Sequence, residues 1–147
     1  MATLTPTLTL ASSDAFAGQP LNLTVTDSLT IAAPMSDISR MNTDDDIGHG
    51  AGVIIDDEDT NEYFVYIKHT GILSSDGKTG ASSSDFILVG NGDSDADSQI
   101  IKLYPGEFCW MTTTPADGTD GGVEVGGIAV AAGSAAVQVN YGYWKRS

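Results

Sequence analysis

The chain has 147 residues, of which 41% are hydrophobic and 18% are charged, so it is long enough for one domain with its own core. Its 20 acidic and 6 basic residues give a net charge of −14. This charge argues against nucleic acid and against an anionic membrane surface as partners, because affinity for both comes from Lys and Arg.

The first predicted element is a strand over residues 3–10, where apolar and polar residues alternate strictly. Its leucines share one face and its threonines the other. Pro6 has no backbone N–H to donate, so the strand lies at a sheet edge or bends there. We expect residues 1–12 to form an N-terminal arm or edge strand and residues 13–147 to form a β-sandwich domain. The arm pairs either within its own domain or with the sheet of a neighbouring subunit.

The alternation continues over residues 21–26 and resumes over residues 29–31, which predicts a strand pair or one long strand with a bulge. Residues 35–46 are ambiguous, because their apolar positions fall three apart and allow one short helical turn. No other stretch favours a helix.

The middle of the chain contains three further predicted strands, at residues 53–55, 62–69 and 86–89. Residues 62–69 are rich in aromatic and β-branched side chains, which makes them the best candidate for a central strand. Residues 72–85 are rich in Ser, Gly and Asp and predict a long exposed loop.

The clearest predicted hairpin joins residues 99–104 to residues 107–113 through Pro105 and Gly106. Proline presets the φ angle of the first central turn residue, and glycine supplies a positive φ at the second.

Strands at residues 128–131 and 137–143 bring the total to roughly nine or ten short strands separated by turn signals. This pattern predicts an all-β fold: a single-domain antiparallel β-sandwich or jelly-roll-like barrel with a short N-terminal arm.

The sequence offers no group of acid, base and nucleophile, so we expect that the chain is not an enzyme. His49 lies in a glycine-rich loop, and His69 closes the predicted strand as a polar end residue. Cys109 is the only cysteine, which rules out an intrachain disulfide, and its position in mid-strand predicts a buried apolar residue.

Two glycine-rich stretches lack the context of nucleotide-binding motifs. Gly77-Lys78-Thr79 resembles the end of a phosphate-binding loop, but Ile72 stands where the first glycine is required. Residues 48–52 precede a strand, whereas a dinucleotide-binding motif follows one and opens a helix.

Asp93, Asp95 and Asp97 are the candidate metal ligands, because they have the alternating oxygen donors of a calcium loop. An EF-hand is excluded, since Ser98 replaces the sharp-turn glycine and Tyr104 replaces the bidentate glutamate. A different calcium site on a β-loop and a solvated acidic turn both remain open, and the solvated turn is favoured. We expect no cofactor other than this candidate calcium.

Four aromatic residues, Trp110, Tyr141, Tyr143 and Trp144, are candidates for binding a sugar. Tyr141 and Tyr143 share a strand face with two valines, so packing in a core or an interface is favoured for them over a sugar platform.

Several general features appear together: the Leu/Thr-rich arm, the runs at residues 63–68 and 100–108, and a last strand that closes with residues 141–145. In these features the chain resembles small accessory virion proteins of tailed bacteriophages, of the capsid decoration or cement type. The resemblance implies a non-enzymatic structural protein that binds and stabilises the outer shell, but it assigns no functional residues.

The partner implied by this resemblance is the major capsid protein or another virion component. We also expect the chain to form a homo-oligomer, and we take a trimer as the working hypothesis. The N-terminal residues lack the basic region and long apolar run of a signal peptide, so we expect synthesis in the host cytoplasm and location in the virion. The alternative is a carbohydrate-binding receptor-binding module associated with a tail or fibre, either with or without a dependence on calcium.

Overall fold

The computed structural model describes residues 2–16, 18–33, 37–45, 52–55, 60–90, 99–113, 128–132 and 135–147. These residues form twelve strands and no helix, so the predicted all-β fold is confirmed. The strands are β1 (Ala2–Leu4), β2 (Thr7–Phe16), β3 (Gln19–Thr26), β4 (Leu29–Ala33), β5 (Ser39–Asn42), β6 (Val53–Ile55), β7 (Tyr63–Leu73), β8 (Ile87–Gly90), β9 (Gln99–Leu103), β10 (Phe108–Thr112), β11 (Ile128–Ala132) and β12 (Val137–Arg146).

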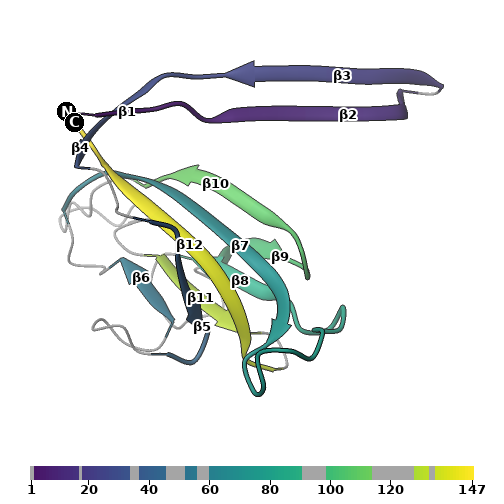
Figure 1. Ribbon diagram of the computed structural model, residues 1–147, viewed down its shortest axis with the longest axis vertical. Coiled ribbons are helices and arrows are strands. Elements are labelled where there is room, and N and C mark those ends of the chain that lie inside the picture. Colours follow the sequence, from purple (N-terminus) through teal and green to yellow (C-terminus); the bar gives the residue numbers. More distant parts are fainter. Residues whose placement is uncertain are drawn as a thin grey trace.

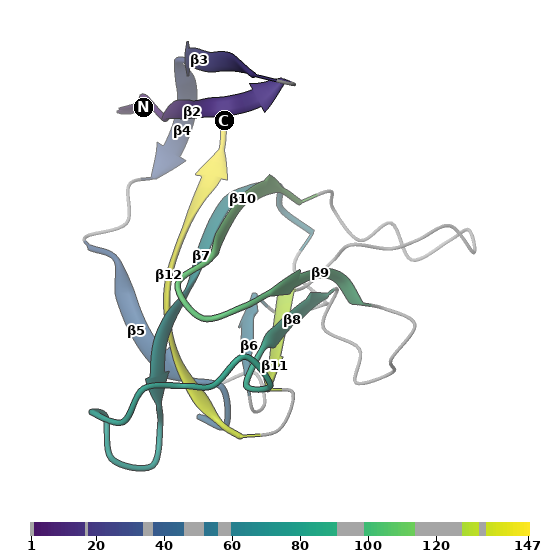
Figure 2. The same ribbon diagram turned by 90° about the vertical axis from the view of Figure 1, so that its right-hand side faces the viewer.

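Two antiparallel sheets pack against each other and form the body of the molecule (Figures 1 and 2). The larger sheet has the order β1-β4-β12-β7-β10, and β5 also pairs with β12. The smaller sheet has the order β6-β11-β8-β9, while β2 and β3 form a separate two-stranded sheet. This arrangement is consistent with a β-sandwich.

The core lies between the two sheets, and its apolar side chains come from both of them. Val65 and Ile67 on β7 and Val137 and Val139 on β12 are fully buried, because alternate residues of a strand point to the same face. From the smaller sheet, β6, β8 and β9 contribute Ile54, Ile87, Val89 and Leu103.

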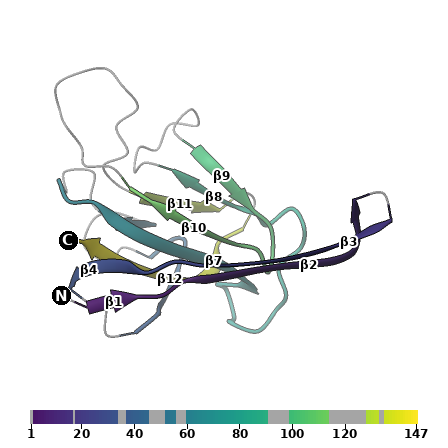
Figure 3. The ribbon, with the colours of Figure 1, turned by 90° about the horizontal axis from the view of Figure 1, so that it is seen from above.

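At one end of the larger sheet, the paired strands β1 and β4 continue as a two-stranded ribbon beyond the body. β1 pairs with β4, which is held in the sheet by β12, and farther along the same two chain segments β2 pairs with β3. The strand is interrupted at Pro6, as the sequence predicts, and the Asp27 N–H donates to the Pro6 carbonyl at 3.1 Å. We call β2 and β3 the arm; it crosses above β10, and its tip projects past the body (Figures 1 and 3).

The predicted division into an arm over residues 1–12 and a domain over residues 13–147 stays a prediction. In the structure β2 continues to Phe16, and its partner in the arm is β3 rather than a strand of the body. The arm is therefore a hairpin and not a single strand.

The predicted hairpin between residues 99–104 and 107–113 is wrong. The turn is present, with Gly106 at a φ of 90°, but β9 pairs with β8 in the smaller sheet and β10 pairs with β7 in the larger one. The turn backbone bonds to β7 instead: the Gly106 N–H donates to the His69 carbonyl, and the His69 N–H donates to the Glu107 carbonyl. These bonds carry the chain from one sheet to the other.

The helical turn allowed by residues 35–46 is absent from the part of this stretch that the structure describes. Residues 39–42 form β5, which pairs with residues 138–141 of β12, and Met41 enters the core. Packing against β12 therefore overrides the helix-like spacing.

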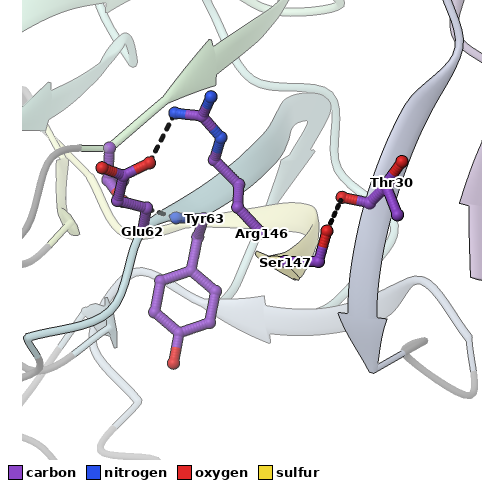
Figure 4. Close-up of polar contacts among 6 residues, drawn as sticks. Thr30, Glu62, Tyr63, Arg146 and Ser147 are labelled. Atoms are coloured by element: carbon purple, nitrogen blue, oxygen red, sulfur yellow. Dashed lines mark hydrogen bonds and ion pairs between the residues drawn. The ribbon is translucent and has the colours of Figure 1, made fainter. Parts of the chain in front are cut away.

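The C-terminal end of the chain is bonded to both of its flanking segments (Figure 4). Arg146 Nη1 lies 2.6 Å from Glu62 Oε2, just before β7, and the Ser147 hydroxyl donates to the Thr30 carbonyl on β4 at 3.4 Å. Because β4 begins where the arm ends, these contacts help to hold the base of the arm on the body.

Candidate binding groove

The arm has one apolar face, and four of its five large aliphatic side chains are exposed; the fifth, Leu21, lies opposite Ser12 and is half-buried. The register places Leu8 opposite Val25 and Leu10 opposite Leu23, so that all four point to the same side of the hairpin. Threonines occupy the other face. The four apolar residues are 42–50% exposed, which is unusual for a contiguous set of large aliphatic side chains.

The outer face of β7 and β10 carries an aromatic surface. It faces away from the core because Val65 and Ile67, the alternate residues of β7, point inward. Phe64 and Trp110 stack with centroids 6.1 Å apart, Trp110 contacts Trp144 at 5.7 Å, and Tyr66 contacts Phe108 at 6.2 Å. Phe108 is 56% exposed and Trp110 is 38% exposed.

A groove separates the arm from this aromatic surface. Its cavity has a volume of about 640 Å³ and is lined by Pro6, Thr7, Leu8, Thr9, Tyr66, Phe108 and Trp110. An adjoining cavity of about 250 Å³ lies nearer the base of the arm and is lined by Pro6, Leu8, Val25, Asp27, Leu29, Phe64, Trp110 and Thr112. We refer to the larger cavity as the groove.

The described residues that line the groove carry no charged side chain, although the chain has a net charge of −14. Among the described residues around the adjoining cavity, Asp27 is the only charged one. Arg146 lies over the Phe64 ring at 5.2 Å, but its charge is paired with Glu62. The groove is thus suited to an apolar or aromatic ligand surface and not to an ionic one.

Cys109 lies on β10, on the opposite face from Phe108 and Trp110, and packs partly against the core. Burial raises the pKa of the Cys109 thiol from its ordinary 9.0 to about 11, a rise that a backbone hydrogen bond to Ile67 only partly offsets. The thiol therefore carries less thiolate at neutral pH than an exposed cysteine and is a weaker nucleophile.

His69 is not a strand-end residue, because β7 continues beyond it through Gly71 to Leu73. Its side chain is fully buried. Nδ1 accepts a hydrogen bond from the Gly71 N–H at 3.0 Å, so Nε2 carries the proton and donates it to the Asp85 carbonyl at 2.6 Å. With both ring nitrogens occupied, His69 fastens the loop before β8 to β7.

The candidate calcium ligands Asp93, Asp95 and Asp97 lie outside the described residues, as does His49. Among the residues that the structure describes, no group of three or more His, Cys, Asp or Glu side chains is placed to hold a metal ion.

Asp76 occupies the backbone donors of the stretch that resembles a phosphate-binding loop. Its carboxylate accepts the Lys78 and Thr79 N–H groups at 2.9 and 2.8 Å, and the Thr79 hydroxyl as well. The Thr79 hydroxyl is the largest cause of the lowering of the Asp76 pKa to about 2, followed by these N–H groups. These donors are already used within the chain.

The four aromatic residues considered as sugar ligands divide between the two faces of the larger sheet. Tyr141 is buried in the core and stacks on Tyr143, as the shared face with the valines predicts. Trp110 and Trp144 lie on the aromatic surface. Phe108 and Tyr66 were not among the predicted sugar ligands, although their alternation with buried neighbours is the signal that places them outside.

A comparison of the chain with protein families, curated proteins and solved structures finds no significant match. Within the described residues, no helix has the length and apolar character needed to cross a membrane.

Proposed function

We propose that the chain is a non-enzymatic structural protein of a virion: a capsid decoration or cement protein that binds and stabilises the outer shell as a homo-oligomer. The observation that carries the proposal is the arm, a hairpin whose apolar face is left half-exposed above an aromatic surface. A two-stranded hairpin is marginally stable alone in water. An arm of this kind is therefore suited to contacts with other molecules of an assembly.

The properties of the groove support an assembly role better than a catalytic one. It offers aliphatic, aromatic and hydroxyl groups, whereas acyl, phosphoryl and glycosyl transfer require a nucleophile, a base or paired carboxylates. A partner in the shell would be the major capsid protein or a neighbouring accessory protein.

Mass spectrometry of purified virions of the phage that encodes the chain tests this proposal. We expect the chain at a fixed stoichiometry to the major capsid protein. We also expect shells stripped of it to release their genome at lower temperature and to regain stability when the purified chain is added back. A virion proteome without the chain would contradict the proposal.

A second candidate is a carbohydrate-binding module, and the exposed rings of Phe108 and Trp110 favour it, because sugars stack on such rings. A glycan array with and without a chelator tests it. Binding that is lost in Phe108→Ala would support this candidate, and a calcium requirement would point to the acidic loop at residues 93–97. No binding in either condition would eliminate it.

A further inference from the structure

Two neighbouring aliphatic pairs of the arm differ in their surroundings. In the pair nearer the base, Leu8 lines both cavities and Val25 lines the smaller one, so these side chains face the aromatic surface of their own chain. In the next aliphatic pair toward the tip, Leu10 and Leu23 lie opposite each other and line neither cavity. They are 42% and 43% exposed.

The charge of the molecule restricts what can cover these surfaces. Two copies of a chain with a net charge of −14 repel each other, unless they meet through surfaces without charge. The groove and the apolar face of the arm are both uncharged. A basic partner would instead be recognised by acidic side chains, and the described part of the groove lining contains none.

The exposed apolar area is large for a single copy and approaches the size of an interface between copies. Leu8, Leu10, Leu23, Val25, Phe108 and Trp110 expose 38–56% of their surface. This leaves on the order of 500 Å² of apolar area per copy in water, at the upper end of what a monomer exposes. Together with the threonines and Tyr66 around them, these residues approach the ~800 Å² per partner of a standard interface.

We propose that the Leu10–Leu23 pair of the arm inserts into the groove of a second copy of this chain, with both side chains packed against Phe108 and Trp110. The two surfaces differ, so each copy gives its arm to one neighbour and receives an arm in its groove. Such a contact closes by reciprocal exchange in a dimer or around a larger ring. The inference deepens the homo-oligomer of the proposed function by naming the contact between its copies, and that contact does not depend on a shell.

The test is the mass of the purified full-length chain by size-exclusion chromatography with light scattering. We expect a closed oligomer for the wild type. The double variant Leu10→Asp/Leu23→Asp places two charges on the apolar face and should weaken association roughly a hundredfold or more. The control, Asn22→Asp/Thr24→Asp, adds the same charge to the opposite face of the same hairpin and should remain oligomeric. Far-ultraviolet circular dichroism checks that both variants fold.

A complementation experiment distinguishes an arm–groove contact from any other association. Phe108→Asp damages the groove and leaves the arm intact, whereas the leucine variant damages the arm and leaves the groove intact. Each variant alone should be monomeric. Mixed together they should form a pair, because one intact arm then meets one intact groove, and this pair should be weaker than the wild-type oligomer.

Three results would overturn the inference: a monomeric wild type at the highest soluble concentration, an oligomer that survives the leucine substitutions, or equal loss in the leucine variant and its control. Its failure is distinct from that of the proposed function. A monomeric chain found on virions would leave the shell-binding part of the proposed function standing, and an oligomeric chain absent from virions would leave this inference standing.

Discussion

The body and the arm are built from the same sequence pattern but differ in how their apolar faces are covered. In the body, the alternate residues Val65, Ile67, Val137 and Val139 are fully buried between two sheets. In the arm, equally regular alternation leaves Leu8, Leu10, Leu23 and Val25 42–50% exposed. Period-2 alternation thus determines that a strand has an apolar face, and the presence of a second layer determines whether that face is buried.

The difference predicts that the two regions contribute unequally to the stability of an isolated copy. The body has a core that is formed by two sheets. The arm is joined to the body through β1 and β4, and only its base, around the smaller cavity, faces the aromatic surface. In an isolated copy, the arm should therefore form a hairpin whose apolar face becomes buried only when another molecule covers it.

The largest expected effect is in the core of the body. Ile67 is fully buried on the central strand β7, so Ile67→Ala should lower the free energy of unfolding by about 2–5 kcal/mol through lost burial and a residual cavity. Urea denaturation of the variant and the wild type measures this. A loss below about 1 kcal/mol would show that the two sheets are not tightly packed at this position.

Thiol labelling compares the two regions within one molecule. The raised pKa of Cys109, about 11 instead of 9.0, leaves about a hundredfold less thiolate at pH 8 than an ordinary thiol has, and labelling should accelerate as the pH rises toward 11. A cysteine introduced by Leu10→Cys is on the exposed face of the arm and should label at the ordinary rate in dilute solution. The double-thiol chain should thus react in two well-separated phases, and equal rates would contradict the contrast.

A substitution at Gly142 tests whether the aromatic surface beneath the arm is closely packed. A Cβ at Gly142 would lie 2.8 Å from both the Trp144 ring and Ile38 Cδ1, so Gly142→Ala should cost about 1–3 kcal/mol. Gly80→Ala is the matched control, because no atom lies closer than 4.0 Å to its added Cβ, and it should be neutral within about 0.5 kcal/mol. Thermal unfolding compares them. Equal stability of the two variants would show that the rings move freely.

The smallest effect is expected in the arm. Leu10→Ala should change the free energy of unfolding by less than about 0.5 kcal/mol at concentrations where light scattering finds single copies, because Leu10 is already half-exposed. Urea denaturation at such a dilution is the measurement. A cost near that of Ile67→Ala would mean that the arm packs on its own body.

The fold class could be predicted from the sequence because it depends on local alternation. The buried residues of β7 and β12 and the interruption at Pro6 follow from strand periodicity and from the missing proline donor. Strand pairing could not be predicted as well. Pro105-Gly106 correctly indicates a turn, but turn chemistry does not determine which sheet each flanking strand joins, and here they join different ones.

The groove could be predicted only in part. Residues 3–10 indicated an arm and Trp110 was a candidate ligand, but the groove depends on a hairpin placed over a distant strand pair, which no local pattern encodes. His69 shows the same limit: its polarity indicated a strand end, whereas hydrogen bonds to Gly71 and Asp85 allow it to be buried.

Amide hydrogen exchange, followed by mass spectrometry over a range of protein concentrations, tests most directly whether the arm is completed by another copy. The account predicts that β7 and β12 are protected at every concentration, and that the arm exchanges rapidly in dilute solution and becomes protected as the chain associates. An arm that is as protected as β7 in dilute solution, or one that stays unprotected at all concentrations, would contradict it.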